Sequence, residues 1–147
     1  MIKKVPLVLN EGGVVSQLAT GDTITGVSID GSMVTPMASG ESTDVIPAGS
    51  PVYCTDDGKV KLAKADSDAT YGVFGYAQND IAPGATGDIQ VEGMVTLPSF
   101  ATVTATSVAL SPGRDYFLSA TTAGRIHDAP PDSGYMVKVG KAFGATK

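Results

Sequence analysis

Short runs in which apolar and polar residues alternate, separated by glycine-containing turns, make up most of the chain. In two such runs, Ile89 and Val91, and then Tyr116 and Leu118, fall on one face of an extended segment. A period of two residues is typical of β-strands. Residues 56–58 (Asp-Asp-Gly) lie between two further short runs and predict a tight hairpin turn. The pattern therefore predicts antiparallel strands joined by hairpins.

One sequence unit occurs three times along the chain. It consists of an apolar residue, a turn, a strand and a second turn that contains glycine. The copies begin at Ile46, Ile81 and Leu110, with the sequences IPAG, IAPG and LSPG. In the first two copies a second glycine lies twelve positions after the isoleucine, and the third copy is two residues longer before its second glycine. Proline followed by glycine predicts a type II turn at residues 111–114, because the glycine position requires a positive φ. Internal duplication and chance similarity within a glycine-rich β protein both account for this spacing.

The composition leaves little room for helices. The 147 residues include 18 Gly and 9 Pro, and the longest runs free of both are thirteen residues, at 59–71 and 99–111. The second run is rich in threonine and valine, which favour strands. We therefore predict an all-β fold: a small antiparallel β-barrel or sandwich built of hairpins. Its β domain would comprise residues 41–147, and residues 1–40 would form an extended N-terminal arm.

The first 40 residues are less regular than the rest and are predicted to be an arm or anchor segment. Apolar residues form a strip near its start, on a segment with little sequence of its own to pack against. An exposed apolar strip usually marks an interaction site. The alternative is an ordinary first strand of the β domain. We predict that the arm contacts a larger assembly or a neighbouring subunit through Val5, Leu7, Leu9, Val14, Val15 and Leu18.

Charge and targeting signals narrow the choice of partners. The formal net charge is -5 and no cluster of basic residues occurs, which argues against nucleic-acid binding because phosphate contacts need Lys and Arg. The first residues contain too few consecutive apolar positions for a signal peptide or a membrane span. We expect no nucleic-acid partner, no membrane partner, and synthesis in a cytoplasm without export.

Residues that could carry chemistry are few and poorly arranged. His127 lies in a proline-rich loop and no GxSxG turn is present, so a solvated loop histidine is expected. Residues 66–77 begin like a calcium loop, but Tyr71 stands where glycine is needed and Ala77 where glutamate is needed. Cys54, the single cysteine, lies in a predicted strand and is expected to be buried and inert. We predict no catalytic residue, no metal site and no cofactor.

Two further classes of function fit the length and the fold class. A trimeric all-β hydrolase of deoxyuridine triphosphate would have this size, and residues 26–31 (GVSIDG) superficially suggest its substrate loop. The Arg-Ser-Gly motif and the C-terminal glycine-rich phosphate motif of that family are missing. A carbohydrate-binding or receptor-binding module would need exposed aromatic platforms, and the chain supplies no Trp, five Tyr and four Phe.

Longer stretches of the chain resemble a known group of proteins. Residues 71–95 (YGVFGYAQNDIAPGATGDIQVEGMV), 110–119 (LSPGRDYFLS) and 134–146 (GYMVKVGKAFGAT) are similar to a β domain that recurs in virion proteins of tailed bacteriophages. That group includes capsid decoration (cement) proteins, head fibres and tail-fibre segments. Residues 6–24 (PLVLNEGGVVSQLATGDTI) also resemble the N-terminal stretch of such fibre proteins.

The resemblance implies a non-enzymatic structural protein, usually a homotrimer, on the capsid surface of a virion. The partner that it implies is the major capsid protein, and synthesis would take place in the cytoplasm of the host bacterium. Because no long shaft or tip follows the β domain, we expect a decoration protein that binds and stabilises the assembled head. The alternative is a head-fibre or tail-fibre module that binds a receptor.

Overall fold

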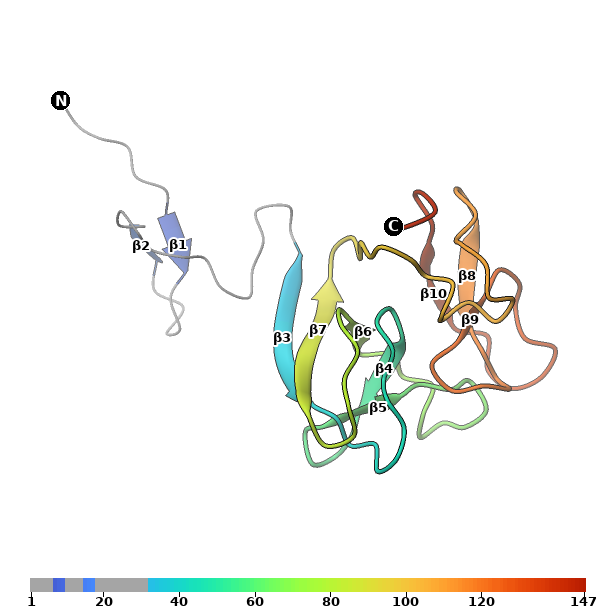
Figure 1. Cartoon of the computed structure of the whole chain (residues 1–147), viewed down its shortest axis with the longest axis horizontal. Helices are drawn as coiled ribbons and strands as arrows, with labels where there is room; N and C mark the ends of the chain where they lie inside the picture. Colours follow the sequence, from blue (N-terminus) through green and yellow to red (C-terminus); the bar gives the residue numbers. More distant parts are fainter. Residues whose placement is uncertain (1–6, 10–14, 18–31) are drawn as a thin grey trace.

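The computed structural model of the chain describes residues 7–9, 15–17 and 32–147 (Figure 1). These residues form ten β-strands and no helix, which confirms the all-β prediction. The strands are β1 (Leu7–Leu9), β2 (Val15–Gln17), β3 (Met33–Ala38), β4 (Pro51–Cys54), β5 (Val60–Leu62), β6 (Gly75–Ala77), β7 (Thr86–Glu92), β8 (Asp115–Leu118), β9 (Ile126–His127) and β10 (Lys138–Lys141).

The larger sheet contains five strands in the order β3-β7-β6-β4-β5, and all its pairings are antiparallel. Its longest pairing joins β3 to β7 through six residue pairs. The two edge strands approach each other at a single parallel bridge between Ser39 and Val60. The N–H of Gly40 donates to the oxygen of Val60 there, at 2.8 Å. The sheet is therefore strongly curved, but its strands do not close into a barrel within the described residues.

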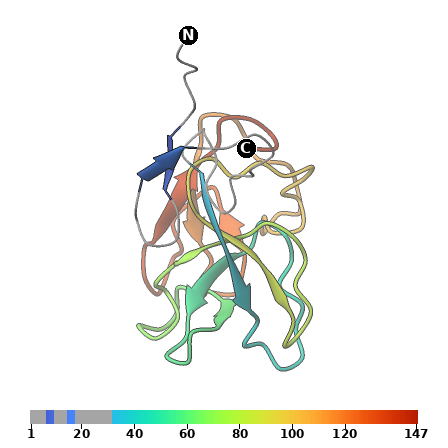
Figure 2. The ribbon, with the colours of Figure 1, turned by 90° about the vertical axis from the view of Figure 1, so that its left-hand side faces the viewer.

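The smaller sheet contains three strands in the order β10-β8-β9 and lies beside the larger one (Figures 1 and 2). Backbone hydrogen bonds from the segment after β5 join the two sheets. Ala65 donates its N–H to Ser119 at 2.9 Å, and its own oxygen accepts the N–H of Tyr135 at 2.7 Å. The oxygen of Ala63 accepts the N–H of Gly124 at 2.8 Å. These bonds hold the sheets together as one β domain.

The repeated sequence unit corresponds to a repeated local structure. We call residues 46–62 unit 1, residues 81–95 unit 2 and residues 110–127 unit 3. Gly49, Gly84 and Gly113 all have a positive φ, of 87°, 72° and 81°. Each first turn is closed by a hydrogen bond between residues three apart, and in unit 3 it runs from the Arg114 N–H to the Ser111 oxygen at 3.2 Å. The turn predicted at residues 111–114 is therefore confirmed.

Units 1 and 2 pair with each other in a reciprocal way. Ile46 and Ile81 exchange two N–H···O=C bonds, each 2.9 Å long. The first strand of unit 1, β4, pairs with β6, which precedes unit 2. The first strand of unit 2, β7, pairs with β3, which precedes unit 1. Each unit thus completes the sheet of the other, and the two share one approximately two-fold arrangement.

The two sheets have separate hydrophobic cores. The core of the larger sheet is aliphatic and sealed, because its six members are at most 1% exposed: Ile46, Val52, Val60, Ala77, Ile81 and Ile89. The core of the smaller sheet combines unit 3 with the preceding loop and with the residue after β10, and it contains two aromatic rings: Leu97, Phe100, Val103, Leu110, Tyr116, Ile126 and Ala142. A third small cluster, Ala63, Ala65 and Leu118, lies where the sheets meet.

The predicted division at residue 40 falls after a strand of the larger sheet. Residues 33–38 form β3, which is an edge strand and so tolerates Pro36 without a lost ladder bond. These residues belong to the sheet of the β domain. Further toward the N-terminus, β1 and β2 form a two-stranded sheet in which Leu9 lies opposite Val15. Among the described strands, β1 and β2 pair only with each other.

Candidate functional site

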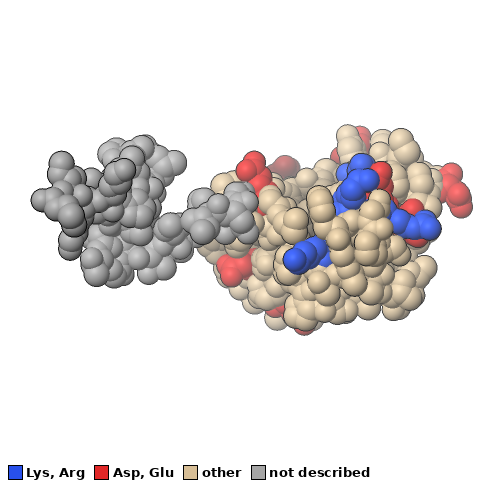
Figure 3. Space-filling model, turned by 90° about the horizontal axis from the view of Figure 1, so that it is seen from above, with Lys and Arg blue, Asp and Glu red and all other residues tan. Residues whose placement is uncertain are grey.

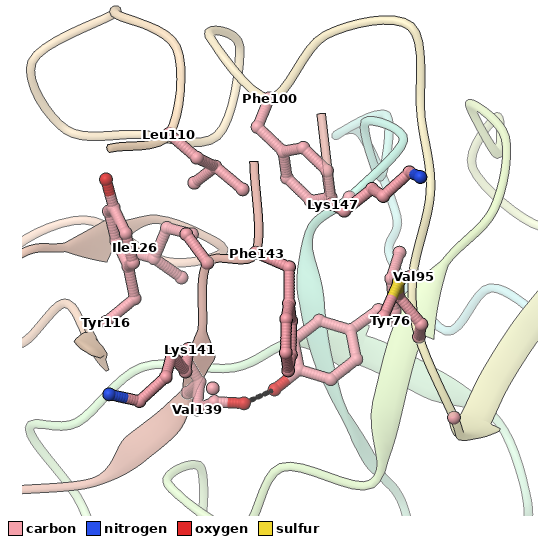
Figure 4. A pocket seen from close by; sticks show the side chains of 15 residues that line it. Tyr76, Val95, Phe100, Leu110, Tyr116, Ile126, Val139, Lys141, Phe143 and Lys147 are labelled. Atoms are coloured by element: carbon pink, nitrogen blue, oxygen red, sulfur yellow. Dashed lines mark hydrogen bonds between the residues drawn. The ribbon is translucent and has the colours of Figure 1, made fainter. Parts of the chain in front are cut away.

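An apolar pocket of about 230 Å³ opens between the two sheets (Figure 4). One wall comes from unit 3 and the residue after β10, and it consists of Leu110, Tyr116, Ile126 and Ala142. The opposite wall comes from β6 and the segment after β7, with Tyr76, Met94 and Val95. Because both sheets contribute, the pocket exists only in the folded domain.

Local structure fixes the unit 3 wall. Leu110 stands at the start of the Pro-Gly turn, and Tyr116 follows that turn in β8, where buried and half-buried positions alternate. The Tyr116 hydroxyl accepts the backbone N–H of Ser111 at 2.8 Å. This bond spans the turn and holds the ring of Tyr116 against the pocket. Ile126 enters from the return strand β9.

Tyr76 links the two sheets at the floor of the pocket. Its hydroxyl donates to the backbone oxygen of Val139, which is drawn as a dashed line in Figure 4. Burial raises the pKa of Tyr76 to about 12. The hydroxyl therefore stays protonated at neutral pH and remains able to donate this bond.

The mouth of the pocket combines an exposed aromatic ring with basic groups. Phe143 is 70% exposed and stands between the two walls in Figure 4. Lys141 and Lys147 also line the pocket. Lys138 and Lys141 both pair with Asp115, at 3.0 and 3.4 Å, and lower the pKa of its carboxyl. In Figure 3, uncharged atoms cover most of the described surface seen from above, with a few scattered charges.

A second open hollow, of about 380 Å³, shares Tyr76 and Val139 with the first. Its lining includes Phe74, and Met136 nearby in the chain is 72% exposed. Tyr71 lies along the same hollow and stacks on Tyr135, with ring centroids 4.6 Å apart. The two hollows meet at the Tyr76 contact, and we call the apolar and aromatic side chains along them the junction surface, defined by Tyr71, Phe74, Tyr76, Met94, Val139 and Phe143.

The predicted interface strip is only partly within the described residues. Leu7 and Leu9 lie in β1 and Val15 lies in β2. Val5, Val14 and Leu18 lie outside the described residues. The role of the strip in binding stays a prediction. Sequence reasoning did not find the junction surface, although aromatic residues occur close to glycine in both 71–77 and 135–143 and were the available signal.

The expectation that Cys54 is buried is wrong, because the side chain is exposed. Cys54 is the last residue of β4 and borders the exposed turn at residues 56–59. The aliphatic core reaches Val52 on this strand, which is fully buried, but does not extend to Cys54. Alternation along a strand fixes which face a residue takes, whereas the extent of the core depends on distant residues.

The few titratable groups singled out in the sequence do not come together. His127 is half-buried at the end of β9, and the neighbouring Asp128 pairs with Arg114 at 3.4 Å. Within the part of the chain that the structure describes, no three His, Cys, Asp or Glu residues are grouped to hold a metal ion. The described residues also include no helix long and apolar enough to cross a membrane.

Comparison with known proteins gives no relative. No protein-family model matches the chain. No curated protein sequence and no solved structure matches it either.

Proposed function

We propose that this chain is a structural protein of a bacteriophage virion, a capsid decoration or cement protein that binds the assembled head and stabilises it. The resemblance of residues 71–95, 110–119 and 134–146 to phage virion domains motivates the proposal. The observation that carries it is the junction surface, an apolar region far more suited to a protein partner than to a reaction. Apolar contact of this kind contributes about 25 cal/mol for each Å² buried.

The residues of the junction surface support attachment by packing. Phe143 is 70% exposed and Phe74 is 41% exposed, so two of the four phenylalanines expose a substantial part of their rings. Large apolar side chains exposed together usually mark a binding surface. Several charged residues in the described part of the chain instead form surface pairs, such as Lys64 with Asp66 at 2.7 Å.

Binding to heads is the direct test. Heads are produced from a phage strain that lacks this gene, purified, and mixed with the full chain. We expect the protein to sediment with these heads, to saturate at a fixed number of copies per head, and to raise the temperature at which the heads release DNA. A chain that stays in the supernatant at all concentrations would contradict the proposal.

Two variants locate the attachment. Deletion of residues 2–20 removes the predicted strip, and Phe74→Ser with Phe143→Ser makes the junction surface polar. If the arm is the anchor, the deletion variant keeps its β circular-dichroism spectrum but no longer sediments with heads. If the junction surface is the anchor, the double variant is the one that fails. Lys59→Ser, on an exposed turn, is the matched control and should bind normally.

The stacked pair Tyr71–Tyr135 favours one second candidate, a receptor-binding module of the virion. The two rings lie 16° from parallel, and both are more than a third exposed. Exposed aromatic faces are the platforms on which sugar rings stack. A glycan-array signal that is lost in Tyr71→Ala and Tyr135→Ala variants would support this candidate over decoration.

A further inference from the structure

Unit 3 pairs with β10 in the same way that unit 1 pairs with β6. This pairing is one half of the arrangement that units 1 and 2 form together. In unit 1, Val52 of β4 lies opposite Gly75 of β6. In unit 3, Tyr116 of β8 lies opposite Gly140 of β10. The bond from Gly49 N–H to Ala77, 2.7 Å, has a counterpart of the same length from Gly113 N–H to Ala142. By this register β10 is equivalent to β6, and Gly140 is equivalent to Gly75.

Among the described residues, the other half of the arrangement has no counterpart around unit 3. In the larger sheet, Ile81 and Ile89 of unit 2 complete the sealed core over Ile46, Val52 and Val60. The equivalent residues of unit 3 line the pocket between the sheets; they are Leu110, Tyr116 and Ile126. The loop at residues 97–103 covers part of this wall. The rest of the wall is open, at the place that corresponds to β7 in the larger sheet.

The strand β10 also has an unused side. β6, its equivalent, is paired on both sides, with β4 and with β7, and the contact with β7 sets Tyr76 opposite Gln90 and Ala77 opposite Ile89. β10 pairs with β8 on one side and is an edge strand among the described residues. An edge strand beside an apolar pocket is a template for a further strand.

The strand pair at the other end of the chain, β1 and β2, lacks a third strand among the described strands. β1 and β2 form a two-stranded sheet that pairs with no other described strand. An isolated hairpin of two strands is marginally stable in water, and a third strand stabilises it. In the single chain the hairpin and β10 belong to separate sheets, so neither supplies the missing neighbour of the other there.

We propose that the β1–β2 hairpin of a second copy adds to the free side of β10 and fills the pocket between the sheets with an apolar side chain. This proposal goes beyond head binding and needs no head. The incoming strand takes the place that β7 has beside β6, antiparallel to β10. The apolar residues of the sequence around β1, Leu7 and Leu9, suit a pocket walled by Leu110, Tyr116 and Ile126.

The contacts at both ends of β10 limit the length of this pairing. The Val139 oxygen already accepts the Tyr76 hydroxyl, and the Phe143 N–H donates to Lys147 at 3.0 Å. Ala142 directs both its N–H and its oxygen toward Arg114 and Gly113, so the free part of the edge is centred on Lys141, the equivalent of Tyr76 in β6. The pairing of β6 with β7 is likewise short, with two residue pairs. The contact is short, and the filled pocket supplies most of its stability.

Gly140 provides a test that leaves the fold unchanged. A Cβ on Gly75 would lie 2.6 Å from the backbone oxygen of Gln90 and 2.7 Å from Cγ2 of Ile89, both in β7. A Cβ on Gly140 meets no atom within 4 Å in the single chain, because no strand occupies that place. Gly140→Val should therefore fold normally and block the incoming strand. Gly144→Val is the matched control, because Gly144 is equally unobstructed and lies outside the proposed contact.

The experiment is disulfide crosslinking between two populations of full-length chain, both carrying Cys54→Ser. One population carries a single cysteine at position 7, 8 or 9, and the other carries Lys141→Cys. After mixing in a glutathione buffer, we expect a disulfide-linked pair of chains for at least one position of β1. Docking raises the effective concentration of the thiols, so the yield should exceed that with Lys59→Cys as partner by about ten-fold or more.

The outcomes separate the alternatives. Gly140→Val and Gly144→Val are each added to the chain that carries Lys141→Cys. The proposal is supported if the linked product is lost with Gly140→Val and retained with Gly144→Val. A yield no greater than with Lys59→Cys at all three positions overturns it. A chain carrying both cysteines that links only to itself also overturns it, because the hairpin would then dock on its own β10. Circular dichroism and thermal unfolding of each variant confirm that the fold is retained.

Discussion

Units 1 and 2 on one hand, and unit 3 on the other, show how one local motif gives two different cores. All three units have a proline-containing first turn and a glycine with positive φ at its third position, although Ala48 separates the proline from the glycine in unit 1. Units 1 and 2 complete each other, and their aliphatic core is sealed. Unit 3 has only β10 as its partner from the later part of the chain, and its core opens into a pocket. The turn motif therefore specifies the strand that follows it. Whether the core beside that strand is closed depends on a second unit packing against the first.

The largest expected difference between the regions concerns the first apolar residue of each unit. Ile46 is fully buried, whereas its equivalent Leu110 already borders the open pocket. Ile46→Ala should lower the free energy of unfolding by about 4 kcal/mol and Leu110→Ala by about 2 kcal/mol, because the second cavity adds to an existing opening. Urea unfolding measures both. Equal losses would show that the two cores are equally sealed.

The second comparison uses the equivalent glycines Gly75 and Gly140. Gly75→Ala forces the new Cβ into the backbone of β7, and such overpacking should cost about 2 kcal/mol. Gly140→Ala should change the unfolding free energy by less than about 0.5 kcal/mol, as for an unobstructed surface position. Urea unfolding at a low, fixed chain concentration provides the measurement. A large loss for Gly140→Ala would mean that β10 is already covered in the single chain.

The third comparison concerns Tyr76, which joins the two regions. Its pKa is raised to about 12 in the folded chain, so folding favours the neutral hydroxyl. This contribution is complete below pH 10 and is lost as the pH rises from 10 to 12. At pH 11 the loss should be about 1 kcal/mol of unfolding free energy. Tyr76→Phe removes the ionisation, so the difference between wild type and variant should shrink over this range; a constant difference would contradict burial of the hydroxyl.

The smallest effect is expected at Cys54, at the exposed end of unit 1. Cys54→Ser should change the unfolding free energy by less than about 0.5 kcal/mol, because the side chain lies outside the sealed core. A thiol reagent should react with Cys54 in the native chain at nearly the rate seen after denaturation. Slow native labelling would place the boundary of the sealed core beyond Val52.

Local chemistry explains what could be predicted from the sequence. The turn at residues 111–114 and the hairpin at residues 56–58 depend on neighbouring residues only, since glycine permits the positive φ wherever it occurs. The all-β fold follows from the short runs between Gly and Pro. In each case the signal lies within a few residues of the structure that it predicts.

Pairing between distant segments explains what was missed. β3 was placed in the arm because its sequence, MVTPMA, has little alternation, and its membership in the sheet depends on β7. The junction surface depends likewise on Tyr76 and Val139, 63 positions apart, coming together across two sheets. The burial of Cys54 was predicted from its strand alone, whereas its exposure follows from where the core ends.

The pairing of β3 with β7 has a consequence for the time at which the domain can form. The two strands are separated by about 50 residues of chain, and the bonds between them form the longest ladder among the described strands. A ribosome adds about 5–20 residues per second, so β3 waits several seconds for its partner to emerge. The β8–β9 hairpin closes as soon as it is made. Nascent chains should therefore expose β3 to chaperones and to one another until residue 92 has left the ribosome.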